Sequence, residues 1–267
     1  MAIALMLSAF VIPMQAQRRT VRYLANYENE PYHFGFLLAY NQMMYTIHTV
    51  ENYQNIALET SQNPWPHGTY DMTETKYLYV YNIETAQTPG FTVGIIGSKR
   101  LGRYFDLRFI PTLSFSDRQL NYTIATEDHN GNIKILSKPL NKPIFTTFVE
   151  FPLNVKYRSK RYNNIGAYLM AGINPKLDLA SQKSNIVTDL DGNSFINNLV
   201  TKRFDFAAEV GVGFDIYNQW FKMGVEIKMG YGLLDVMKKK KKKKSLIYTV
   251  PIDKLSNKMF QFSFLFE

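Results

Sequence analysis

The last nine residues, Met259 to Glu267, read MFQFSFLFE, so four phenylalanines alternate with other residues at the C-terminal end. Because side chains of a β-strand point to opposite faces in turn, this segment would present one wholly aromatic face and one mixed face. Such a segment is typical of a lipid-facing closing strand of a β-barrel. A water-soluble β-sandwich would turn the same face inward, so the other strands must decide between the two.

The composition is that of an all-β protein. The 267 residues include 19 Phe, 18 Tyr and 2 Trp, so aromatic residues make up 15% of the chain, and the length suits one large domain. No apolar run approaches the roughly 20 residues that a membrane-spanning helix requires. If the chain enters a membrane, it therefore does so as a barrel.

One continuous apolar run, Ala2 to Met14, lies at the N-terminus and is followed by Gln15 and Ala16. Its length and small-residue ending resemble a secretory signal with cleavage after Ala16, although no basic residue precedes Arg18. We therefore expect a signal peptide at residues 1–16 and one outer-membrane barrel domain at residues 17–267; the alternative is a buried N-terminal helix. The chain has no cysteine, which excludes disulfides, thiolate metal sites and a lipid anchor on an N-terminal Cys.

The net charge of +9 comes largely from one tract of seven lysines, Lys238 to Lys244. Without the tract, 24 basic residues (31 less 7) face 22 acidic ones, which leaves +2. A nucleic-acid-binding protein would carry a basic face with interleaved aromatic residues, and no such face accompanies the tract. We therefore expect no nucleic-acid partner.

Eight segments combine period-2 alternation with flanking turn residues, which predicts eight strands. Most of them have ten or more residues. That exceeds the roughly five or six residues of strands in soluble proteins and matches the roughly 9 to 11 needed to cross a bilayer at a tilt. The predicted strands are 32–41, 91–101, 104–116, 145–158, 164–177, 202–217, 220–234 and 258–267.

The connections between these segments alternate in length. Short turns at 102–103, 159–163 and 218–219 alternate with long segments, which are 42–90, 117–144, 178–201 and 235–257. Short periplasmic turns and long extracellular loops are typical of outer-membrane barrels. The sequence therefore predicts an eight-stranded antiparallel transmembrane β-barrel in the outer membrane, with both termini on the short-turn side.

Charged residues share one face of each predicted strand. Unpaired charges in a water-soluble core would each cost several kcal/mol, so this face should line a polar lumen while the apolar face meets lipid. Eight strands leave an interior just wide enough for side chains, so we expect a salt-bridged plug; a narrow ion or proton path is the alternative. The predicted lumen polar network is Asp106, Arg108, Glu150, Lys156, Arg158, Asp205, Glu209, Asp215, Lys222, Glu226 and Lys228.

Catalytic and metal-binding signals are weak. The four histidines are His33, His48, His67 and His129, and none has the spacing of a Ser/His/Asp site. Asp189 to Asn193 resembles a calcium-loop fragment but lacks the length and the terminal Glu, which favours a turn. We expect no enzymatic activity, no cofactor and no metal.

Basic residues gather at the predicted periplasmic edge. They form a candidate docking rim for a periplasmic or membrane partner, and the alternative is anchoring beside anionic lipid headgroups. The rim consists of Lys99, Arg100, Arg103, Lys160 and Arg161.

Three stretches go beyond a generic barrel pattern: residues 26–36, residues 89–111, and residues 150–161, which read EFPLNVKYRSKR. Together with the ending FLFE they resemble the PorT-like outer-membrane barrels of Bacteroidota, which are associated with type IX secretion and, in gliding bacteria, with motility. The resemblance implies a non-enzymatic component or accessory of protein secretion that acts by interaction with other type IX components, rather than as the conduit. A general small pore or a surface adhesin remains the alternative.

Overall fold

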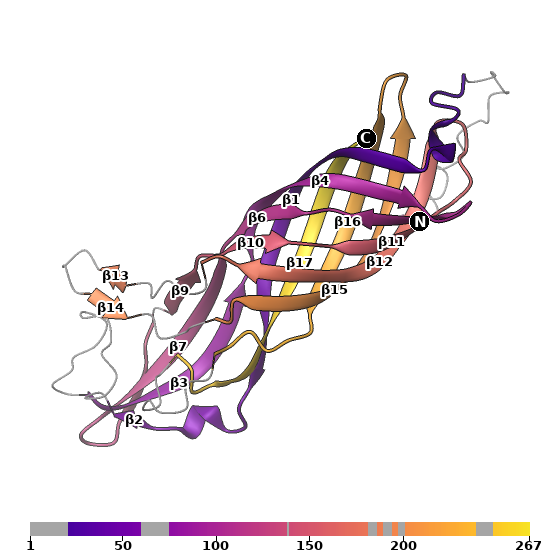
Figure 1. The fold of residues 1–267 in the computed structure, drawn as a ribbon. Helices are drawn as coiled ribbons and strands as arrows, with labels where there is room; N and C mark the ends of the chain where they lie inside the picture. The colour runs from indigo at the N-terminus through magenta and orange to yellow at the C-terminus, as the bar shows by residue number, and fades with distance from the viewer. Residues whose placement is uncertain are drawn as a thin grey trace, which may run out of the picture.

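The computed structural model describes residues 21–59, 75–137, 139–180, 186–188, 194–196, 201–238 and 248–267, and within them the chain is built of strands with two single-turn 3-10 helices (Figure 1). No helix in this part of the chain is long and apolar enough to span a membrane. In chain order the elements are η1 (Tyr27–Asn29), β1 (Tyr32–Thr49), η2 (Tyr53–Asn55), β2 (Leu58–Glu59), β3 (Thr75–Ala86), β4 (Thr88–Arg100), β5 (Phe105–Phe109), β6 (Thr112–Ser116), β7 (Arg118–Asp128), β8 (Ile133–Ile135), β9 (Leu140–Ile144), β10 (Thr147–Glu150), β11 (Leu153–Arg158), β12 (Ile165–Asp178), β13 (Ile186–Thr188), β14 (Ser194–Ile196), β15 (Phe204–Tyr217), β16 (Lys222–Gly232) and β17 (Ile252–Phe266).

The main sheet closes on itself. Antiparallel pairs link β4 to β1, β1 to β17, and then β16, β15 and β12 in turn. The circle is completed because β12 pairs with both β10 and β11, these pair with β6 and β5, and β5 and β6 both pair with β4. Since β5 with β6, and β10 with β11, each occupy one position, the ring has the eight positions that the sequence predicts.

Each of the two divided positions is interrupted at a proline. Pro111 separates β5 from β6, and Pro152 separates β10 from β11. Proline has no backbone N–H to donate, so the ladder of backbone hydrogen bonds is interrupted there. The proline carbonyls still accept hydrogen bonds across the breaks, from Ile95 N to Pro111 O at 3.1 Å and from Ile110 N to Pro152 O at 3.2 Å. The wall of the ring is therefore continuous.

The two faces of the ring differ in chemistry. Along β15, Phe204, Val210 and Phe214 are 52–59% exposed on the outside, whereas Asp205 and Glu209 are 2% and 4% exposed on the inside. The same alternation of apolar outward and polar inward side chains continues along β16 and β11. The ring thus has an apolar outer surface and a polar interior.

The strands extend well beyond the ring at the end opposite to the C-terminus, where β2, β3 and β7 lie (Figure 1). Residues 42–90 and 117–144, which were predicted as long extracellular loops, form strands over much of their length, and the prediction is wrong there. Strand β3 pairs with β7 over most of their lengths, and β1 runs on to Thr49. The alternation of apolar and polar residues in β3 is not visible in the sequence, because register shifts after Thr75 and Val80 interrupt the two-residue period. Asn130-Gly131, a residue pair that favours a tight hairpin turn, forms one here, with Ala125 opposite Ile135 and Gly131 at φ 83°.

An apolar core fills the inside of this extension. It joins β1, β3, β7 and β17 to residues 236, 237 and 248, so that the extension forms a packed structure of its own. The core consists of Tyr45, Leu58, Leu78, Val80, Ile83, Leu120, Tyr122, Ile124, Ile144, Val236, Met237, Tyr248, Ile252 and Leu255.

Candidate functional site

All eleven residues of the predicted lumen network lie inside the ring, and none is more than 9% exposed. Four ion pairs join members of the network to one another. They are Arg108 with Glu226 at 2.7 Å, Lys156 with Asp215 at 2.6 Å, Arg158 with Asp106 at 3.0 Å, and Lys228 with Glu209 at 3.0 Å. The remaining three pair with residues that the sequence analysis did not select: Lys176 binds Glu150 at 3.4 Å, Glu267 binds Lys222 at 2.6 Å, and Asn257 donates to Asp205 at 2.6 Å.

Tyr168 lies at the centre of the charged interior. Its hydroxyl donates to Glu226 at 2.8 Å, the same carboxylate that accepts from Arg108. The ring of Tyr168 has the Lys156 ammonium 3.7 Å and the Arg108 guanidinium 5.2 Å from its centroid. Gly213 makes room for this ring, because a Cβ at that position would collide with it. The side chains of four strands thus fill the centre of the ring.

Uncharged polar groups continue the packing from this centre towards the extension. Asn174 donates to Glu150 at 2.7 Å and to Glu209 at 2.6 Å, and so connects two ion pairs. Closer to the extension, Asn41 donates to Thr92 at 2.6 Å and to Ser114 at 3.0 Å. Buried polar groups stay stable when they are hydrogen-bonded in this way.

The two-residue alternation of a strand could have identified some of the lumen residues that were not predicted. Lys176, Asn174 and Tyr168 share one face of the predicted strand 164–177, and all three point inward. Glu267 follows the last strand residue, so alternation continues to it from Gln261, Ser263 and Leu265, which are at most 1% exposed. The alternation does not predict which residue each of them pairs with, because that depends on which strands face one another across the ring.

The long-loop end of the interior is closed by one cation and by the apolar core. Arg118 is 1% exposed, and its guanidinium lies 4.9 Å from the Tyr45 ring centroid and 4.6 Å from that of Phe148. It donates to the Tyr45 hydroxyl at 3.1 Å. Beyond it, Leu120 and Tyr122 are completely buried in the core of the extension.

The opposite, short-turn end is crossed by residues 21–31, which we call the N-terminal strap. Tyr27 is its anchor: the ring stacks on His33 at 4.1 Å between centroids, and the hydroxyl donates to Glu267 at 3.1 Å. Burial and the Glu267 carboxylate together raise the pKa of Tyr27 far above its usual value. The strap also accepts a hydrogen bond from Tyr217, whose hydroxyl donates to Glu28 at 3.3 Å.

The five residues of the predicted docking rim divide into two groups. Arg100 donates to Asn29 O at 3.1 Å, and Arg161 donates to Tyr23 O and, at 3.3 Å, to Leu24 O. These two arginines therefore hold the strap. The other three, Lys99, Arg103 and Lys160, are exposed.

The remaining sequence candidates assemble no reactive site in the described part of the chain. His48 and His129 lie in separate parts of the extension, and no group of three or more metal-ligating side chains occurs among the described residues. His67, the Asp189 to Asn193 fragment, Lys239 to Lys244 and residues 1–20 with the expected signal peptide lie outside the described residues.

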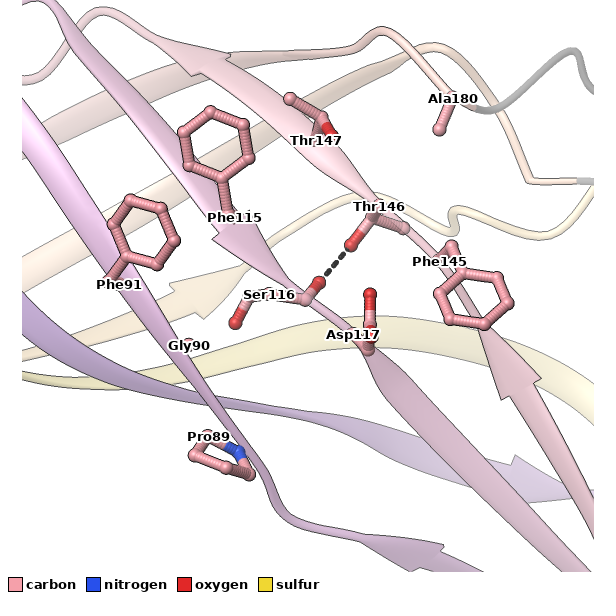
Figure 2. Close-up of a pocket in the computed structure, with 10 residues that line it drawn as sticks. All are labelled: Pro89, Gly90, Phe91, Phe115, Ser116, Asp117, Phe145, Thr146, Thr147 and Ala180. Atoms are coloured by element: carbon pink, nitrogen blue, oxygen red, sulfur yellow. Dashed lines mark hydrogen bonds between the residues drawn. The ribbon is translucent and has the colours of Figure 1, made fainter.

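A pocket of about 560 Å³ lies where the ring passes into the extension (Figure 2). Phe91 and Phe115 stack on its wall with centroids 4.8 Å apart, and the Thr146 hydroxyl donates to Ser116 O. Asp117 is the one ionisable side chain among the ten lining residues. The Ser116 hydroxyl donates to the Asn41 side chain at 2.6 Å, so neither this hydroxyl nor that of Thr146 donates to the Asp117 carboxylate.

Residues 15–238, more than four fifths of the chain, match the family model described as outer membrane protein beta-barrel domain. The chain belongs to this family. It is accordingly an outer-membrane protein, and the closed ring is its barrel.

Two solved structures are similar to it in part. The crystal structure of Neisserial surface protein A (NspA) aligns with a TM-score of 0.38 and 9% identity, over 88% of this chain and 98% of the other. That of the outer membrane protein OprG from Pseudomonas aeruginosa aligns with a TM-score of 0.33 and 7% identity, over 87% and 92%. A comparison with curated proteins gave no match.

Proposed function

We propose that this protein is a non-conducting, non-enzymatic outer-membrane barrel that binds other proteins at its ends, as an accessory of type IX secretion and, in gliding bacteria, of motility. Its apolar outer face contacts the membrane lipid. The observation that carries the first part is the filled interior, in which six ion pairs lie with every member at most 11% exposed at the side chain.

The charge pattern of the interior argues against a conduit. Ion-selective pores commonly use rings of one sign of charge, so that an ion meets a uniform field. Here each buried carboxylate of these pairs lies against a cation, and the Tyr168 ring packs against the cations of two pairs, Arg108 and Lys156. An ion would have to break these pairs and then pass the N-terminal strap and the apolar core of the extension. The barrel is therefore better suited to hold surfaces in the membrane than to transport solutes.

Support for the secretion role comes from the stretches that resemble the PorT-like barrels. Residues 26–36 supply most of the strap and the start of β1, residues 89–111 supply Arg100, and residues 150–161 supply Arg161. Their side chains meet at the short-turn end, where Arg100 binds Asn29 O and Tyr27 binds Glu267. Parts of these stretches thus meet at the short-turn end, and we favour this end as the place where a partner docks.

A deletion strain tests the function directly. Loss of secretion of proteins that carry the type IX sorting domain, with solute permeability unchanged, is the expected result. The extension with its packed core favours one second candidate, a surface adhesin, and the general small pore is the other alternative. Normal secretion combined with reduced adhesion or altered solute uptake would replace the proposal by one of these.

A charge reversal tests docking at the rim without breaking the strap. Lys99 and Lys160 are exposed, so K99E/K160E should leave the barrel inserted while it weakens attraction to an acidic partner surface and reduces secretion. The matched control is K134E/K254E, which makes the same charge change at the far end of the barrel. Equal secretion by the two variants would contradict docking at the rim.

A further inference from the structure

A cationic pocket of about 260 Å³ lies between the N-terminal strap and two of the short turns. Five of its eight lining residues are basic, and one is acidic, which leaves a formal charge of +4 on the lining. The residues are Arg22, Glu28, Arg103, Tyr104, Arg158, Ser159, Lys160 and Arg161. The pocket is separate from the central ion pairs and from the pocket in Figure 2, and three of its lining residues, Arg103, Lys160 and Arg161, also belong to the proposed docking rim.

Two of these cations are balanced by carboxylates. Arg158 pairs with Asp106 at 3.0 Å inside the barrel, and Arg22 pairs with Glu28 at 3.5 Å on the surface. Arg103, Lys160 and Arg161 form no ion pair with any residue that the structure describes. Arg161 donates to the strap carbonyls of Tyr23 and Leu24, to Asn163 O and to the Asn164 side chain, and its guanidinium carbon lies 3.7 Å from the centroid of the Tyr217 ring. Four of its five N–H groups therefore already have partners, and Arg161 contributes its charge to the pocket more than free donors. Burial, and then the charge of Arg22, lower the pKa of Arg161, as expected where cations accumulate.

Three unpaired cations around one concave space suit an anion with several oxygens. Arginine binds phosphate with its planar fork, and lysine adds a compact charge, so the lining matches a phosphate group. The Ser159 hydroxyl, another lining group, already donates to Lys160 O at 3.3 Å.

The surroundings indicate that this phosphate belongs to a lipid. Arg103 lies over the ring of Tyr104 at 5.4 Å, Tyr104 is 6.4 Å from Tyr157, and Tyr157 is 5.2 Å from Phe105, between ring centroids. Tyr157 and Phe105 are each 47% exposed on the apolar outer face of the barrel. A continuous path therefore leads from the cations to the surface that meets acyl chains, at the level where aromatic residues border a membrane.

We propose that this pocket binds the phosphate of an anionic glycerophospholipid from the adjoining membrane leaflet, with Arg103 and Lys160 as its ligands and Arg161 as a further positive charge beside them. The acyl chains lie along Phe105 and Tyr157. Such a bound lipid would brace the N-terminal strap against the β11–β12 turn, because Arg161, whose charge attracts the phosphate, hydrogen-bonds both the strap and the turn.

The full chain in neutral detergent micelles, titrated with phosphatidylglycerol and followed by native mass spectrometry, tests the proposal. R103Q/K160Q should weaken the tightest lipid site about thirtyfold, which corresponds to about 1 kcal/mol for each basic residue. The matched control is K99Q/K134Q, which removes the same charge from outside the pocket and should leave that site unchanged. Both variants spare Arg161 and the strap, so their folded band on gels should match that of the unmutated chain.

Two results would overturn the proposal. One is equal phosphatidylglycerol affinity of R103Q/K160Q and K99Q/K134Q, which would make the attraction a general surface effect. The other is binding of inorganic phosphate at least as tight as that of the lipid and equally sensitive to R103Q/K160Q, which would assign the pocket to free phosphate. Loss of secretion is not part of either readout, so the outcome is independent of the proposed function.

Discussion

Replacing Glu226 by Gln should destabilise the folded barrel by about 3–5 kcal/mol, the cost of breaking a buried ion pair by removing one partner. The magnitude follows from the site: Arg108 and Glu226 are each 1% exposed at the side chain, and their charged atoms are 2.7 Å apart. In E226Q the buried Arg108 guanidinium stays charged but loses the carboxylate that it pairs with, in a space that Tyr168 also fills. The folding equilibrium constant should therefore fall at least about a hundredfold.

The assay is equilibrium unfolding in urea in lipid vesicles, with the folded fraction read from gel migration before and after boiling. R22Q is the control, because the Arg22–Glu28 pair is 3.5 Å long with its side chains 54% and 26% exposed, and such pairs contribute at most about 1 kcal/mol. The double variant R108M/E226L removes both charges and should recover most of the loss, since apolar replacement of a whole buried pair is often close to neutral. Equal stability of E226Q and R22Q would refute the reasoning, because it would mean that water screens the interior.

Three further results are expected. Gly213→Ala should prevent most of the protein from reaching the heat-modifiable folded form on gels, because the new Cβ would collide with the Tyr168 ring and lie 2.8 Å from Val225 O. The control Gly166→Ala should fold normally, because the nearest atom to its Cβ would be 3.9 Å away. Equal folding of the two variants would contradict the packing. Tyr27→Ala should speed proteolysis of the strap at Arg22 far more than Tyr27→Phe does. The Phe variant keeps the ring stacked on His33 and loses only the hydrogen bond to Glu267. Equal rates of cleavage in the two variants would mean that the ring stack does not hold the strap. Hydrogen bonds from Asn132 and Asn130 lower the pKa of Asp128. The amides of the hairpin tip should therefore be protected from hydrogen exchange above the usual Asp pKa and lose this protection as the pH falls through the lowered pKa. Protection that is unchanged in acid or in D128A would contradict this.

Alternation alone predicts most of the ring. The strand β15 places Asp205, Glu209 and Asp215 on one face and Phe204 and Phe214 on the other, and this pattern depends only on the two-residue period of a strand. It carries over to all eight positions, including the two that Pro111 and Pro152 interrupt. Strand β3 was not predicted, because its bulges shift the period partway along the strand.

The contacts at the short-turn end could not be predicted in the same way. Tyr27 and Glu267 are 240 residues apart, and Arg161 reaches the strap from 138 residues away. Neither Tyr27 nor Arg161 lies on a strand, so no periodicity fixes where they point. The predicted docking rim therefore combined two arginines that hold the strap with three exposed basic residues, because sequence position alone does not distinguish them.

The central claim is that the barrel is filled and closed. Single-channel recording of the full chain in planar lipid bilayers tests it most directly. Folded protein, verified by its heat-modifiable gel band, should give no conductance steps above the baseline of the bilayer. Reproducible steps of one size that disappear when the protein is unfolded before addition would contradict it.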